Sequence, residues 1–150
     1  MAMHTWFECK IRYEKVMENG MQKKVTEPYL VDALSFTEAE ARIIEEMTPF
    51  ISGEFTVSDI KRANYSELFP SDEESADRWF KCKLIFITLD EKSGAEKKTS
   101  TQVLVQAADL RDAVKKLDEG MKGTMADYQI GMVSETPLMD VYPYNAGPND

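Results

Sequence analysis

The sequence predicts an α+β fold made of two tandem β-β-α-β repeats, with antiparallel sheet and a pseudo-two-fold relation between the repeats. The first reason is internal similarity, which indicates a duplicated supersecondary unit. Residues 6–13 and 79–86 are identical at four of eight positions at an offset of 73, and the matches include both tryptophans and both cysteines of the chain. The second reason is apolar patterning that changes from period two to a helical period within each copy. Whether the two copies share one sheet is left open.

Each copy opens with a predicted strand. Apolar and charged side chains alternate over residues 7–13, so one face of this strand should be buried. The second copy keeps the same inner face over residues 80–86, but Ile85 and Ile87 make its outer face apolar as well. This second strand is therefore expected to be more deeply covered, or to lie at a contact.

A turn and a second strand follow in each copy. Gly20 and Gly94 mark the turns, because glycine tolerates the positive φ of tight hairpin connections. The second strands are expected over residues 22–33 and 96–107, where apolar residues again alternate with polar ones.

A helix and a third strand complete each copy. Ser35 and Glu38 form a capping box, in which the hydroxyl accepts from the Glu38 amide and the carboxylate reaches back. Asp109 is the predicted N-cap of the second helix. Third strands are expected over residues 54–62 and 127–135, and short extended pieces then lead into Phe69-Pro70 and Tyr142-Pro143. The predicted domains are a first repeat over residues 4–70, an acidic linker over 71–78, a second repeat over 79–143 and a loose tail over 144–150.

Composition indicates a globular chain with an acidic surface. The 150 residues are 43% hydrophobic and carry a net charge of −9. Such acidity opposes binding to nucleic acid or to an anionic membrane. No secretory signal and no apolar run of about 20 residues is seen, so a cytoplasmic location is expected. Reduced thiols are therefore expected at Cys9 and Cys82 in place of a disulfide.

Three stretches of the sequence resemble a known family. They are the opening Trp-Phe-x-Cys-Lys, residues 31–41 (Val-Asp-Ala-Leu-Ser-Phe-Thr-Glu-Ala-Glu-Ala) and the closing Asp-Val-Tyr-Pro of residues 140–143. Together they resemble the uncharacterised family known as domain of unknown function 4494, over residues 4–143. The resemblance implies a small protein of gut Bacteroidetes and of phages or mobile elements that infect them. It implies no activity, cofactor or site residue.

Catalytic and metal-binding motifs are weak. His4, the single histidine, lies near a terminus, where a general base would lack fixed geometry. Cys9 and Cys82 are better explained as small buried apolar residues than as nucleophiles. The acidic cluster Asp72, Glu73, Glu74 and Asp77 lacks the alternating spacing of a calcium loop, and a solvated linker explains it better. We therefore predict no catalytic residue, no metal site and no cofactor.

The outer face of the first strands is the candidate binding surface. It combines aromatic and basic residues, as single-strand nucleic-acid binders do: Trp6, Lys10, Arg12, Lys23 and Lys24 in the first copy, and Trp79, Lys81, Lys83, Lys97 and Lys98 in the second. The competing interpretation is that each tryptophan caps its sheet and the lysines solvate an exposed face. The overall acidity favours this competing interpretation.

These observations predict a non-enzymatic binding or adaptor protein of a phage or mobile element, with a protein as its partner. Two similar surfaces on one chain can gain avidity without new chemistry. Single-stranded nucleic-acid binding through the aromatic and basic face is the alternative. An apolar strip on a soluble protein usually marks a contact, so Ile85 and Ile87 also predict a homodimer.

Overall fold

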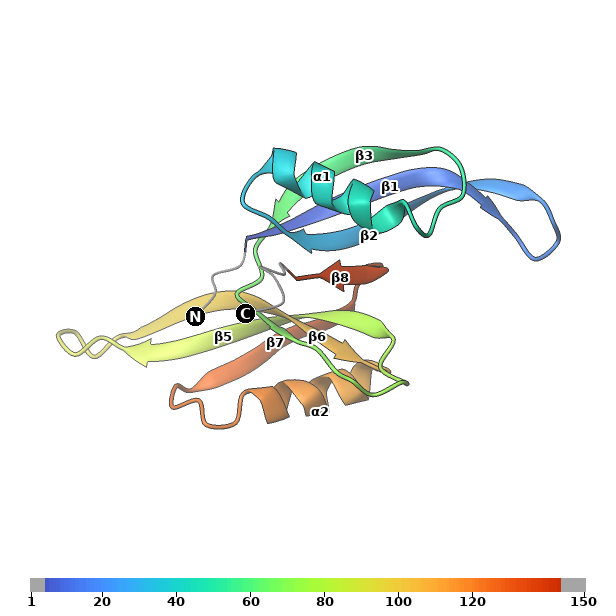
Figure 1. Cartoon of the computed structure of the whole chain (residues 1–150). Coiled ribbons are helices and arrows are strands. Elements are labelled where there is room, and N and C mark those ends of the chain that lie inside the picture. The colour runs from blue at the N-terminus through green and yellow to red at the C-terminus, as the bar shows by residue number, and fades with distance from the viewer. Residues whose placement is uncertain (1–4, 144–150) are drawn as a thin grey trace, which may run out of the picture. The chain divides into compact units, whose positions relative to one another are not determined.

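The computed structural model describes residues 5–143, which form two compact units. Within this range, unit 1 comprises residues 5–64 and 137–143, and unit 2 comprises Tyr65–Thr136. Unit 2 is therefore one continuous stretch of chain, whereas unit 1 is interrupted by it. Both units contain one helix and one sheet (Figure 1), so the α+β class is confirmed.

Unit 1 contains a four-stranded sheet with the order β3-β1-β2-β8. Its elements are β1 (Trp6–Val16), β2 (Gln22–Asp32), α1 (Phe36–Met47), β3 (Phe55–Ala63) and β8 (Asp140–Tyr142). β1 pairs antiparallel with both β2 and β3, while β8 pairs parallel with β2.

Unit 2 contains a four-stranded sheet with the order β4-β6-β5-β7. Its elements are β4 (Glu67–Phe69), β5 (Arg78–Leu89), β6 (Glu96–Ala107), α2 (Leu110–Gly120) and β7 (Tyr128–Glu135). β5 is antiparallel to β6 and β7, and β4 is parallel to β6. Both sheets are thus mixed, and the expectation of purely antiparallel sheet is wrong for the short fourth strands.

The predicted helix starts are confirmed by their side-chain contacts. The Ser35 hydroxyl accepts from the Glu38 amide at 3.1 Å, and the Glu38 carboxylate accepts from the Leu34 amide at 3.1 Å. In α2 the Asp109 carboxylate accepts from the Asp112 amide at 2.8 Å. These contacts satisfy amides that the first helical turn would otherwise leave unpaired.

Each helix covers one face of its own sheet. In unit 1 the enclosed core contains Phe7, Cys9, Ile11, Val31, Ala33, Ala39, Ile43 and Met47. In unit 2 it contains Phe80, Cys82, Leu84, Val103, Val105, Ala107, Ala113, Leu117 and Met121. The strand residues of both cores follow the period of two that the sequence predicted.

The two thiols lie in these two separate cores and are free cysteines. Burial raises the pKa of Cys9 to about 12, with the Glu8 carboxylate adding to the effect. Burial alone raises the pKa of Cys82 to about 11. A thiol that stays protonated near neutral pH is a poor nucleophile, so both side chains act here as core residues.

The short fourth strand of each sheet comes from the end of the other sequence repeat. β4 follows β3 of unit 1 along the chain but pairs with β6, where Leu68 lies opposite Leu104. β8 follows β7 of unit 2 but pairs with β2, where Val141 lies opposite Leu30. The compact units therefore differ from the sequence repeats 4–70 and 79–143 in residues 65–70 and 137–143.

The short connection after β3 explains why β4 does not join its own sheet. The last residue of β3 lies opposite Trp6 of β1, which in turn lies opposite Asp32 of β2. A fourth strand in the position of β8 begins beside Tyr29, at the other edge of the sheet. The distance from the end of β3 to that position covers three strand spacings across the sheet and three residues along a strand, which is roughly 17 Å. Four residue steps, from Ala63 to Glu67, span at most about 14 Å. The chain therefore reaches the edge of a different sheet.

β8 is fastened to unit 1 by several polar and aromatic contacts. The Met139 amide donates to the Pro28 carbonyl at 2.9 Å. The Arg42 guanidinium of α1 donates to the carbonyls of Asp32 and Pro143. The rings of Tyr29 and Tyr142 stack with centroids 6.2 Å apart. These contacts make the last strand an integral part of unit 1.

Because unit 2 is continuous and contains its own four strands, residues 65–136 should fold alone. We expect a cooperative thermal melt and a dispersed amide spectrum for this fragment. Residues 1–64 should fail both criteria, since they lack β8. A control chain, in which a Gly-Ser linker joins Asn64 to Pro137, should restore folding of unit 1. Equal stability of residues 1–64 with and without the β8 segment would contradict the assignment.

Candidate functional site

A groove with a volume of about 910 Å³ lies at one end of unit 1. One wall is the β1–β2 hairpin, with residues 12–16, Gln22 and Lys24. The other wall is the connection from α1 to β3, with residues 50–54 and Thr56. The hairpin continues past the end of α1 (Figure 1).

The connection from α1 to β3 is shaped by local hydrogen bonds. The amides of Phe50 and Ile51 both donate to the Met47 carbonyl, at 3.0 and 3.1 Å, and so close the helix. Pro49, which precedes Phe50, has no amide hydrogen to donate. Gly53 has a φ of +128°, a conformation that favours glycine. As a result, the Phe50 side chain is 76% exposed at the groove.

A polar cluster lies beside the groove on the face of the sheet that carries α1. The Tyr13 hydroxyl donates to the Glu27 carboxylate at 2.7 Å, and the Tyr29 hydroxyl does so at 3.4 Å. The Lys15 ammonium reaches the other Glu27 oxygen at 3.5 Å. The Glu27 side chain is 12% exposed, and these three partners satisfy its carboxylate oxygens.

The tyrosines of this region are held in the neutral form. Burial, with the Glu27 hydrogen bond and charge, raises the pKa of Tyr13 to about 12. Burial and the charge of Glu27 likewise raise the pKa of Tyr29. Burial and then Asp140 raise the pKa of Tyr142 to about 12. The hydroxyls of Tyr13 and Tyr29 therefore act as hydrogen-bond donors to the Glu27 carboxylate next to the groove.

Unit 2 replaces this polar cluster with less polar residues. In the matching strand registers, Tyr13 corresponds to Phe86, Glu27 to Thr101 and Tyr29 to Val103. Phe86 packs into the unit 2 core beside Tyr128. The carboxylate with its tyrosine and lysine partners is thus a feature of unit 1 only.

The two tryptophans of the predicted binding face are buried. Trp6 is 3% exposed and Trp79 is 5% exposed, and each precedes a core phenylalanine that points to its helix. Successive side chains of a strand point to opposite faces, so both indoles lie on the face away from the helix, as predicted. Buried rings of this kind offer no free surface on which a base could stack.

Only some of the basic residues predicted for that face line the groove. Arg12 and Lys24 line the groove, together with Lys15, which the sequence interpretation did not include. Lys10 is half-buried, and Lys23 is exposed outside the groove lining. In unit 2, Lys81 is half-buried, while Lys83, Lys97 and Lys98 are exposed.

The apolar strip of β5 is half-buried. A side chain added at Gly131 of β7 would meet the end of the Ile85 side chain at 2.9 Å, so glycine leaves room for this isoleucine. Ile87 lies opposite Lys98 on β6. Self-association through Ile85 and Ile87 stays a prediction.

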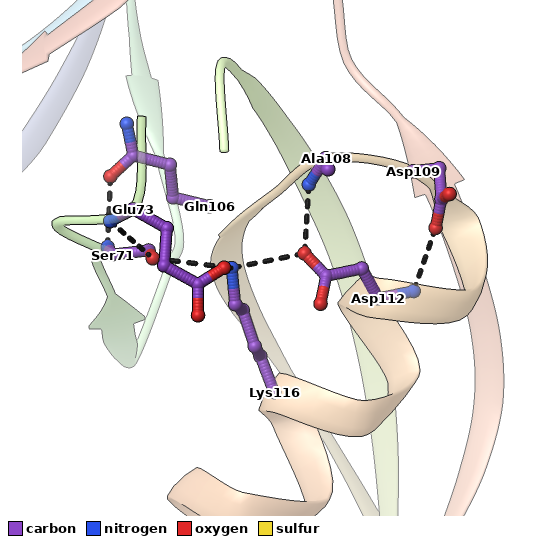
Figure 2. Close-up of polar contacts among 7 residues, drawn as sticks. All are labelled: Ser71, Glu73, Gln106, Ala108, Asp109, Asp112 and Lys116. Carbon is purple, nitrogen blue, oxygen red and sulfur yellow. Dashed lines mark hydrogen bonds and ion pairs between the residues drawn. The ribbon is translucent and has the colours of Figure 1, made fainter. Parts of the chain in front are cut away.

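The acidic segment after β4 is attached to unit 2. The Lys116 ammonium of α2 contacts Asp112 at 2.9 Å, Glu73 at 3.1 Å and the Ser71 hydroxyl at 3.2 Å (Figure 2). The Ser71 amide donates to the Gln106 side chain at 2.9 Å. Ala76, further along the segment, is buried. Ser71 and Glu73 are thus held at β6 and α2, while the acidic side chains of the segment, Asp72, Glu73, Glu74 and Asp77, are exposed.

Asp112 and Lys116 each favour the charged form of the other. The hydrogen bond from the Ala108 amide, and then Lys116, lower the pKa of Asp112. Burial would lower the pKa of Lys116, but the hydrogen bonds and charges of Asp112 and Glu73 outweigh this effect and raise it. The contact therefore joins the cap of α2 to the segment that carries β4.

No group of three or more histidine, cysteine or acidic side chains within residues 5–143 is arranged to hold a metal ion. His4 and the tail over residues 144–150 lie outside the described residues. Neither helix in the described part of the chain is long and apolar enough to cross a membrane.

The sequence interpretation missed Phe50, Lys15 and the Glu27 cluster. One signal was present: Glu27 interrupts the otherwise apolar inner-face series of Val25, Tyr29 and Val31. An acidic residue at an inner position requires partners. The exposure of Phe50 follows from the path of the connecting loop and had no sequence signal.

Replacing Lys116 with methionine should loosen residues 71–76, because methionine keeps the packing of the stem but loses all three polar contacts. Amide hydrogen exchange of Ser71 and Glu73 should accelerate by about fivefold to tenfold. Lys115→Met, which removes the same charge from an exposed position on α2, should leave this exchange unchanged.

The same segment should loosen in acid. The pKa of Asp112 is lowered in the folded state, so its contribution is complete above about pH 4 and is lost as the pH falls through the folded-state value. Exchange rates that are independent of pH in this range, after correction for the intrinsic rate, would contradict the role of Asp112.

Comparison with known proteins gives one result. No curated protein and no solved structure matches the chain. A family with the description Domain of unknown function (DUF4494) matches residues 5–144, which is nearly the whole sequence. The stretches quoted for the resemblance contribute the first core strand, the α1 N-cap and β8. The chain therefore belongs to the DUF4494 family.

Proposed function

We propose that the protein is a non-enzymatic binding or adaptor protein of a phage or mobile element, and that the groove of unit 1 holds part of a protein partner. The observation that carries this proposal is the groove itself. It combines exposed apolar side chains, Val16 and Phe50, with the cations of Arg12 and Lys24. Its volume of about 910 Å³ falls within the range of ordinary binding sites.

The construction of the groove supports a binding role. One wall is a paired hairpin held by the Tyr13 and Lys15 contacts to Glu27. The other is a loop closed onto α1. Both walls are therefore set by hydrogen bonds before a partner arrives, which lowers the ordering cost of association.

Two matched double variants test this proposal. Val16→Ser/Lys24→Glu changes the groove, and Leu89→Ser/Lys98→Glu changes the corresponding positions of the unit 2 hairpin. All four side chains are exposed, so both variants should stay folded, with a small loss of thermal stability in the first because Lys24→Glu places a carboxylate opposite Glu14. In capture from lysate of the native host, a stoichiometric partner of the wild type should be lost from the first variant and kept by the second. Equal retention by both variants would refute binding through the groove.

Nucleic-acid binding is weakened as an alternative. That hypothesis depended on base stacking by Trp6 and Trp79, which are 3% and 5% exposed. What remains is a set of basic side chains in a protein of net charge −9. A protein partner is therefore the better-supported proposal.

We also infer that the chain consists of two copies of one β-β-α-β repeat. Supporting this, the two helices have equivalent caps, and Leu68 lies opposite Leu104 just as Val141 lies opposite Leu30. The pseudo-two-fold relation between the copies stays a prediction.

Residues 1–75 alone test the duplication. Since β4 cannot reach its own sheet, we expect two such fragments to exchange β4 and form a homodimer, with Leu68 opposite the partner's Leu30. Light scattering should give twice the monomer mass, and Leu68→Asp should abolish the dimer. A folded monomeric fragment would argue against an exchangeable repeat.

A further inference from the structure

The charge of the groove is opposite to that of the chain as a whole. Arg12, Lys15 and Lys24 line it against the carboxylates of Glu14 and Glu54, whereas the chain carries a net charge of −9. Glu14 lies across the hairpin from Lys24. Within residues 5–143, neither Arg12 nor Lys24 is within ion-pair distance of an acidic side chain. Both cations are therefore available to an acidic partner.

The apolar part of the groove comes from both walls. Val16 on the hairpin is 66% exposed and Phe50 on the loop is 76% exposed. Met17 and Met21, at the adjacent hairpin turn, are also exposed. An apolar side chain that enters between Val16 and Phe50 would remove apolar surface from water on both walls. Methionines at the rim can adapt their shape to different partners.

The backbone of β1 adds a third feature. Pairing of β1 with β3 stops at Tyr13, opposite Phe55. β1 itself continues to Val16. On that side no strand in the described part of the chain pairs with residues 14–16. These residues also line the groove, so an extended segment lying there could hydrogen-bond to the open edge of β1.

We propose that the groove binds an extended segment of a partner protein in which acidic residues lie two positions before and two positions after an apolar residue, so that all three side chains point to one face. The apolar side chain lies between Val16 and Phe50. The acidic side chains face Arg12 and Lys24, and the backbone extends the sheet along residues 14–16 of β1. This inference rests on the proposed binding function and specifies the chemistry of the partner.

The probe is an array of synthetic nine-residue peptides, each with Leu, Ile, Phe or Trp at the centre and Glu or Asp two positions before and two positions after it. Fluorescence anisotropy should detect binding by at least one peptide. Its affinity should fall when the salt concentration rises, because the ion pairs lie at an exposed groove. Amide shifts of the labelled full-length protein should concentrate at residues 14–16 and 50–54.

The matched variants supply the specificity control. Val16→Ser/Lys24→Glu should weaken binding by about tenfold or more, and Leu89→Ser/Lys98→Glu should change it by less than about twofold. Peptides with lysine in place of the acidic residues should bind at least about tenfold more weakly.

Several results would overturn the inference. They are the failure of every acidic peptide to bind, equal binding by the lysine peptides, and shifts that lie outside the groove. Tighter binding of oligothymidine at the same residues would assign the groove to nucleic acid instead. If the peptides fail while the groove variant still loses the partner captured from lysate, only the partner chemistry is wrong. If the groove variant keeps that partner, the proposed function fails as well.

Discussion

The length of the connection between β3 and β4 is the constraint on which the rest of the structure depends. With only residues 64–66 between the two strands, β4 cannot pass to the far edge of its own sheet. It pairs with β6 instead, and the equivalent open edge beside β2 is filled by β8 from the other end of the chain. The chain thereby becomes one unit inserted into another, although its sequence reads as two consecutive repeats.

This arrangement gives the two units unequal dependence on the rest of the chain. Unit 2 is complete within Tyr65–Thr136, and its first strand is tied to α2 through the contacts of Ser71 and Glu73 with Lys116. Unit 1 requires a strand that follows the whole of unit 2 in the sequence and is held by Arg42 and by the stacking of Tyr29 with Tyr142. A short parallel strand contributes few backbone hydrogen bonds, so these side-chain contacts carry much of its attachment.

The two units have the same elements but different surfaces around the first hairpin. In unit 1 the carboxylate of Glu27 is half-buried and accepts hydrogen bonds from Tyr13, Tyr29 and Lys15. In unit 2 the corresponding positions are Phe86, Thr101 and Val103, which need no charge compensation. A buried charge is tolerated only with fixed partners. The cluster therefore stabilises the hairpin wall of the groove.

The sequence by itself determined the local structure. The capping residues Ser35 and Asp109, the turn glycines Gly20 and Gly94 and the alternation in β1 and β5 depend on neighbours a few residues apart, and each lies where expected. Free, buried cysteines follow from the same alternation. These features have short-range causes, which a sequence pattern can show directly.

Only the tertiary structure decided which sheet each fourth strand joins, because that depends on the distance the chain must cover in space. It also decided the position of the groove, since Phe50 and Val16 are 34 residues apart in the sequence and line the same groove through the path of the loop that follows α1. The tertiary structure also decided which residues of the predicted aromatic and basic face are buried and which line the groove. Alternation assigned Trp6 and Arg12 to one face, but how deeply each is buried depends on packing that no local pattern contains.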